Sequence, residues 1–102
     1  MSAAAKTSQT AGKVLDVLAA LLGHFAHGMT PTDLCKATGL EPSAVTRYVA
    51  TLEEKGFAER IPETGRIRPS AHLARHAVSI LRSLDAAAER LENMKSRITS
   101  TN

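Results

Sequence analysis

Residues 39–57 read GLEPSAVTRYVATLEEKGF, and this stretch decides the fold. Pro42 is suited to the first turn of a helix, and Gly56 to the position just after a helix ends. The apolar residues between them recur at three- and four-residue intervals, as in a helix with one buried face: Val45, Tyr48, Val49 and Leu52. The stretch therefore predicts a helix over residues 42–55.

A shorter helix is predicted just before it. Thr30 is suited to the N-cap, Pro31 to the first helical position, and Asp33 to the positive end of the helix dipole. Gly39 is expected to end this helix. Because two helices joined by a short turn that includes a glycine form a helix-turn-helix, the sequence predicts this motif.

The upstream segment predicts a further helix with one apolar face, formed by Val14, Leu15, Leu18, Leu21, Leu22 and Phe25. Thr10 is expected to cap this helix, which would run to about Ala26 before Gly28 ends it. Residues 1–9 are small and polar, and we expect them to form a flexible arm.

Downstream, residues 57–69 predict a small β-hairpin. Apolar and polar residues alternate over 57–61 and again over 66–68, and residues 62–65 (PETG) favour a turn. A hairpin with a charged tip converts a helix-turn-helix into a winged helix. The expected fold class is mainly α: a winged helix-turn-helix over residues 10–69, followed by one long helix.

The last segment, residues 70–102, predicts that long helix. Ser70 can cap it, and its apolar residues are spaced alternately by four and three residues, which is the pattern of a coiled coil. The sequence therefore predicts that two copies of the chain join along this seam: Leu73, Ala77, Ile80, Leu84, Ala87, Leu91, Met94 and Ile98. For the part up to about Leu84, packing against the first helix of the same chain is an alternative.

Composition excludes several other classes of protein. The chain has 102 residues, enough for one domain, and only three aromatic residues, which argues against a β-sandwich or a base-stacking platform. Cys35 is the single cysteine, and neither His24–His27 nor His72–His76 has the acidic or thiol partner that a metal site needs. No phosphate-binding loop or nucleophile elbow points to an enzyme, and no cofactor is expected.

No segment is expected to span a membrane. The longest apolar region, residues 14–22, contains Asp16 and is too short to cross a bilayer. A single cysteine is typical of a reducing compartment, so we expect a cytoplasmic, nucleoid-associated protein. The formal net charge is +3, and residues 41–69 carry equal numbers of acidic and basic residues. Net charge alone therefore does not identify the partner, and the positions of the cations matter more.

The outer face of the 42–55 helix has the chemistry of a helix that reads DNA. Small side chains let a helix enter the major groove, hydroxyls bond phosphates or base edges, and arginine can bond guanine twice. The residues expected to contact DNA from this helix are Pro42, Ser43, Ala44, Thr46, Arg47 and Thr51. From the hairpin, Arg60, Arg66 and Arg68 are expected to contact the DNA backbone, with ordinary surface charge as the competing interpretation.

Residues 11–68 resemble the N-terminal DNA-binding domain of the IclR family of bacterial regulators, chiefly through residues 39–57. The Val45-Thr46-Arg47 and Leu52-Glu53-x-x-Gly56 elements are also similar to MarR-type winged helices. The resemblance implies a dimer with the third helix in the major groove and the wing on the flanking backbone. IclR-family members normally carry a large C-terminal effector domain, for which this sequence has no room, so no small-molecule effector is implied.

Two functional hypotheses follow. The first is a homodimeric transcriptional regulator that binds double-stranded DNA at a specific sequence, and its small size indicates a phage, plasmid or mobile-element origin. The alternative is a winged-helix adaptor that binds proteins and has no contact with DNA. The near-neutral charge of residues 41–69 keeps the alternative open.

Overall fold

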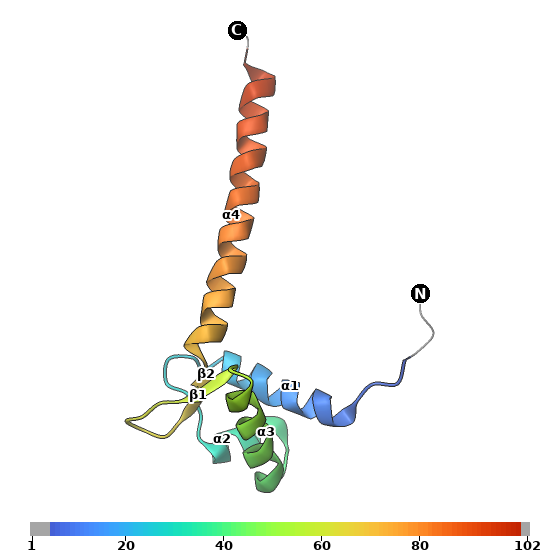
Figure 1. Cartoon of the computed structure of the whole chain (residues 1–102), viewed down its shortest axis with the longest axis vertical. Helices are drawn as coiled ribbons and strands as arrows, with labels where there is room; N and C mark the ends of the chain where they lie inside the picture. Colours follow the sequence, from blue (N-terminus) through green and yellow to red (C-terminus); the bar gives the residue numbers. More distant parts are fainter. Residues whose placement is uncertain (1–4, 101–102) are drawn as a thin grey trace.

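The computed structural model describes residues 5–100, and over this range the chain forms four helices and one β-hairpin (Figure 1). Of the arm predicted over residues 1–9, residues 1–4 lie outside the described range, as do residues 101–102 of the last segment. The elements in chain order are α1 (Gln9–Leu22), α2 (Pro31–Thr38), α3 (Pro42–Glu54), β1 (Ala58–Arg60), β2 (Ile67–Pro69) and α4 (Ala71–Thr99). The predicted fold class, a mainly helical winged helix-turn-helix followed by a long helix, is confirmed.

Helix α1 begins and ends at positions other than those predicted. Its N-cap is Ser8 and not Thr10, because the Ser8 hydroxyl oxygen accepts a hydrogen bond from the backbone N–H three residues later, at 3.1 Å. The helix ends at Leu22, four residues before Ala26, and the next N–H groups no longer follow the α-helical pattern. The N–H of His24, for example, donates to the carbonyl only three residues back, at 2.9 Å.

The buried face of α1 also differs from the prediction. Val17 and Leu21 are completely buried, whereas Leu15 and Leu22 are 61% and 56% exposed. Leu15 and Leu22 thus form a second apolar stripe, beside the one that packs against α2, α3 and β2. The sequence pattern identified the helix but did not determine which stripe forms the core.

The predicted start and end of α2 are confirmed in detail. The Thr30 hydroxyl oxygen accepts from the N–H of Asp33, and the N–H of Thr30 donates to the Asp33 carboxylate, both at 3.0 Å. This reciprocal capping box satisfies two N–H groups that the helix itself leaves free. The bond from the Thr30 N–H lowers the pKa of Asp33 below its ordinary value. Gly39 ends the helix in the left-handed conformation, with φ of 73°.

The loop between α1 and α2 is joined to the hairpin. Strands β1 and β2 pair antiparallel, with Glu59 opposite Arg68, and Met29 forms an isolated bridge to Ile67. The backbone of Met29 donates to Ile67 at 2.7 Å and accepts from it at 2.8 Å. Gly28 does not end α1 as predicted, since it lies six residues beyond that helix; it turns the chain into this bridge with φ of 72°.

The hydrophobic core lies between α1, α2, α3 and the hairpin. Its buried members are Val17, Leu21, Met29, Leu34, Val45, Tyr48, Val49, Leu52, Ala58 and Ile67. Helix α4 contributes no buried residue to it, and Figure 1 shows the helix projecting away from this body. The alternative in which α4 packs along α1 up to Leu84 is therefore wrong for this chain. No helix within residues 5–100 has the length and apolar character needed to cross a bilayer.

Candidate nucleic-acid interface

Helix α3 is held by one face and exposes the other. Its four apolar residues are buried as predicted: Val45, Tyr48, Val49 and Leu52. On the opposite face Ser43, Thr46, Arg47 and Thr51 are exposed, as is Pro42 at the first position, whereas Ala44 is partly buried against the core. Because the buried face fixes the rotation of the helix, the small and hydroxylated side chains share one solvent-facing surface.

The threonine hydroxyls of this surface are held in fixed orientations. The Thr46 hydroxyl donates to the carbonyl oxygen of Pro42 at 3.0 Å, and the Thr51 hydroxyl donates to that of Arg47 at 3.1 Å. Each hydroxyl proton is therefore used within the helix, and each oxygen keeps lone pairs for an outside donor. The two oxygens lie five residues apart along α3, and each can accept a hydrogen bond from a base amino group.

Arg47 is the only cation on the exposed middle of α3. Its guanidinium lies over the ring of Tyr48, 5.6 Å from the ring centroid, and forms no ion pair with any residue between 5 and 100. Cation–π contact restricts the side chain without using its N–H donors. The guanidinium therefore remains free to bind a planar acceptor.

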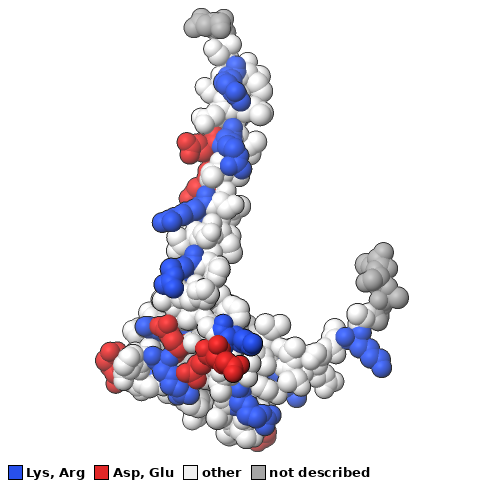
Figure 2. Space-filling model, in the orientation of Figure 1, with Lys and Arg blue, Asp and Glu red and all other residues white. Residues whose placement is uncertain are grey.

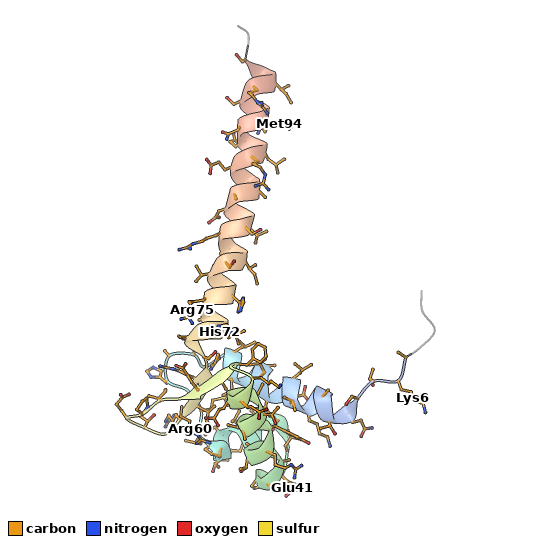
Figure 3. The ribbon with its side chains drawn as sticks, in the orientation of Figure 1. Lys6, Glu41, Arg60, His72, Arg75 and Met94 are labelled. Carbon is orange, nitrogen blue, oxygen red and sulfur yellow. The ribbon has the colours of Figure 1, made fainter. Side chains whose placement is uncertain are left out.

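Both ends of α3 carry carboxylates, but those carboxylates lie in different surroundings. Glu41 lies at the start of α3, at the end of the body away from α4 (Figure 3). Its side chain makes no bond to the first turn, so backbone N–H groups there remain available. At the other end Glu53 lies 3.6 Å from the Nε of Arg60, from which we conclude that Arg60 partly neutralises it. The Glu53 carboxylate is thus turned toward the hairpin.

The three arginines of the hairpin lie in different environments. Arg68 is half-buried, and its Nε and Nη2 lie 3.0 and 2.9 Å from the same oxygen of Glu59. Arg60 is shared between Glu53 and the carbonyl oxygen of Gly65, at 3.5 Å. Arg66 is exposed, and its guanidinium bonds to no side chain in the described part of the chain. Figure 2 accordingly shows acidic and basic groups side by side on the body.

An open hollow beside the hairpin, with several ionisable side chains in its lining, was not predicted from the sequence. It has a volume of about 570 Å³, and its lining includes His24, His27, Asp33, Lys36 and Arg66. These residues come from three separate segments, which the bridge between Met29 and Ile67 brings together. No local sequence motif therefore indicates the hollow. Within residues 5–100, no three metal-binding side chains converge, and the His72 and His76 rings meet edge to face at 4.9 Å.

The fold and the exposed face of α3 together define a winged helix-turn-helix domain of the DNA-binding class. The family model of the IclR helix-turn-helix domain matches residues 10–62, and the chain belongs to this family.

One solved structure extends the similarity beyond the matched domain. The crystal structure of Pseudomonas aeruginosa HmgR superimposes with a TM-score of 0.65 at 25% sequence identity and covers 87% of this chain. The match covers 37% of HmgR, so this chain spans well under half the length of that protein. No curated protein matches the sequence.

Proposed function

We propose that the protein is a transcriptional regulator that binds double-stranded DNA at a specific sequence as a homodimer. In this proposal α3 enters the major groove and the hairpin, residues 57–69, contacts the flanking backbone. The observation that carries the proposal is the exposed face of α3, where small and hydroxylated side chains surround the Arg47 guanidinium, which forms no ion pair within the described part of the chain. A face of this kind fits a groove about 12 Å wide, and bulky or acidic side chains would not.

The roles within the interface differ by residue. Arg47 is proposed to bond guanine through two hydrogen bonds, with Ser43 accepting or donating at neighbouring base edges or phosphates and Thr46 accepting from a base amino group. Pro42, Ala44 and Thr51 complete the contact surface. In the wing Arg66 is the strongest phosphate ligand, because Arg60 and Arg68 are already engaged by carboxylates and contribute less.

The homodimer is proposed to form along α4. Leu84 and Leu91 are 62% and 66% exposed, and Ile98 is 75% exposed, although they share one face of the helix. Burying Leu91, Met94 and Ile98 contributes about 5 kcal/mol before the cost of association. A two-fold dimer places two α3 helices in successive major grooves, so the DNA site should be an inverted repeat with half-sites about one helical turn apart, or a multiple of it.

Selection of bound sequences from random DNA, followed by substitution of Arg47, tests the proposal. Arg47→Ala should weaken binding to the selected site by about 1–3 kcal/mol and relax the preference at one base position. Arg82→Ala, which removes the same charge from the exposed surface of α4, is the matched control and should bind like the wild type. Recovery of no sequence motif, or equal binding by Arg47→Ala, contradicts sequence-specific recognition by α3.

The adaptor hypothesis is separated from this proposal by salt dependence. Ion pairs between Glu53 and Arg60 and between Glu59 and Arg68 neutralise part of the hairpin, which favours a surface for protein binding. DNA binding releases counterions, so affinity for DNA should fall steeply with salt, with a slope set by the number of phosphates contacted. A flat salt dependence together with unaffected Arg47→Ala favours the adaptor.

A further inference from the structure

The direction of α4 depends on very few contacts. The helix has no buried residue along its 29 positions, and it leaves the body at its first turn (Figures 1 and 3). Beneath its first turns, an apolar hollow of about 330 Å³ separates it from the end of α1, with Leu22, Phe25, Leu73 and Ala77 in the lining. Close packing therefore does not fix the angle between α4 and the body.

Ser70 forms one half of the junction that does fix this angle. Its hydroxyl donates to the carbonyl oxygen of Gly56, just after α3, at 2.6 Å, and its N–H donates to that of Phe57 at 2.9 Å. The same hydroxyl oxygen accepts from the N–H of Leu73 at 3.0 Å. Ser70 is itself 5% exposed, so one buried side chain caps α4 and binds it to the end of α3.

Glu59 of β1 forms the other half. One carboxylate oxygen accepts from the N–H of Ala71 at 3.1 Å, in the first turn of α4, and the other oxygen binds the Arg68 guanidinium. The first of these bonds and then the arginine hold the pKa of Glu59 below its ordinary value. A carboxylate at a helix N-terminus is also favoured by the helix dipole. The hairpin is therefore bound to α4 at the same point as α3.

We infer that Ser70 and Glu59 are positioning residues that set the spacing between the two DNA half-sites. The inference rests on the proposed function, in which the paired α4 helices form the axis of the dimer. In each protomer α3 and the hairpin are hydrogen-bonded to the start of α4 through Ser70 and Glu59. A rotation at the junction moves the two α3 helices in opposite directions, and a displacement of about 3.4 Å corresponds to one base pair. The junction thus selects which half-site spacing both α3 helices can reach.

The first test measures the junction directly and without DNA. Spin labels are attached to the full chain through Glu63→Cys, in the hairpin turn, and Glu89→Cys, on α4, with Cys35→Ser removing the native thiol. Labelled protein is diluted with unlabelled protein so that only distances within one chain are observed. We expect one narrow distance distribution, which Ser70→Ala and Glu59→Gln broaden or shift, while the control Ser83→Ala leaves it unchanged. An unchanged distribution in both junction variants overturns the inference.

The second test measures spacing preference on DNA. The two half-sites of the selected operator are moved apart or together by one and two base pairs, and affinity is measured for each. The wild type should lose affinity on the order of tenfold at the wrong spacing, and Ser70→Ala should lose only about threefold, since one or two hydrogen bonds no longer hold the angle. Affinity for an isolated half-site should not fall in Ser70→Ala, which separates positioning from a general loss of folding.

The two failures are distinguishable. If the wild type binds no DNA, the proposed function fails, and the distance measurement still decides whether Ser70 and Glu59 hold α4. If the wild type binds DNA and discriminates between spacings, but Ser70→Ala and Glu59→Gln keep the same spacing profile, the inference about the junction fails. The proposed function as a DNA-binding regulator is then unaffected. Glu59→Gln retains an acceptor for the N–H of Ala71 and should have the smaller effect of the two, so the reverse order also contradicts the inference.

Discussion

Helices α3 and α4 carry the same kind of apolar pattern and use it in opposite ways. In α3 the residues at three- and four-residue spacing are buried inside the chain, whereas α4 has no buried residue at all. The difference teaches that helical periodicity identifies a face that needs a partner but does not identify the partner. For α3 the partners are α1, α2 and the hairpin, and for α4 we propose a second copy of the chain.

Truncation after Leu84 should have the largest effect and acts on α4 alone. It removes Leu91, Met94 and Ile98, so we expect a monomer by sedimentation. Because a dimer binds two half-sites together, affinity for the complete operator should fall on the order of 10²–10⁴-fold. The body should keep its free energy of unfolding, since α4 contributes no buried residue to it. A truncated chain that still sediments as a dimer, or a full-length chain that sediments as a monomer, would contradict the proposed dimer along α4.

A substitution in the hydrophobic core tests the packed body, as the truncation tests the exposed α4. In the truncated monomer, Leu21→Ala should lower the free energy of unfolding by about 2–5 kcal/mol, because the side chain is completely buried. The control is Leu15→Ala in the same helix, which is 61% exposed and should change it by less than about 0.5 kcal/mol. Chemical denaturation measures both values. Equal losses in the two variants would contradict the observed orientation of α1.

The sequence was most informative where structure is decided locally. Thr30, Pro31 and Gly39 bound α2 because capping and a left-handed turn involve only neighbouring residues, and both were predicted correctly. The end of α1 and its buried face were predicted wrongly because two apolar stripes compete in that helix. Contacts with α3 and β2, which are distant in sequence, select between them.

The same distinction holds for the candidate site: features decided by neighbouring residues were predictable, and features decided by distant contacts were not. Exposure of Ser43, Thr46 and Arg47 follows from the periodicity of α3. The pairing of Arg68 with Glu59 depends on the register of the hairpin, which residue types alone do not determine. The hollow beside the hairpin and the junction at Ser70 depend on contacts between segments that are 12 or more residues apart, so neither could be seen in a local pattern. Their roles toward DNA stay predictions.

Two glycines show that the body is packed more tightly at one of its turns than at another. Gly28 and Gly39 both have φ near 73°, but a Cβ on Gly28 would lie 2.7 Å from the carbonyl oxygen of Ile67, and one on Gly39 would meet nothing within 4 Å. Gly39→Ala should therefore cost about 1 kcal/mol of folding free energy for its backbone conformation alone. Gly28→Ala should cost about 1–3 kcal/mol more, because the bridge to Ile67 must shift. Thermal and chemical denaturation of the two variants give the difference directly, and equal costs would show that the bridge yields easily.

The smallest expected effect is a dependence of stability on pH at the junction between the body and α4. The pKa of Glu59 is lowered on folding, first by the N–H of Ala71 and then by Arg68, so the ionised carboxylate stabilises the folded state. This contribution is complete above the unfolded value of about 4.5 and is lost as the pH falls through the lower value of the folded state. Asp33 acts in the same direction through its bond from the N–H of Thr30, so the wild type should lose stability progressively in acid.

The Glu59→Gln variant measures how much of this loss of stability in acid comes from Glu59 at the junction. The variant cannot ionise at this position, so its free energy of unfolding should fall less steeply with decreasing pH than that of the wild type, and the two curves should converge in strong acid. Glu63→Gln, in the exposed hairpin turn, is the matched control and should leave the wild-type slope intact. If Glu59→Gln also keeps the wild-type slope, the carboxylate does not hold α4 to the hairpin in solution. The orientation of α4 relative to the body would then depend on Ser70 alone.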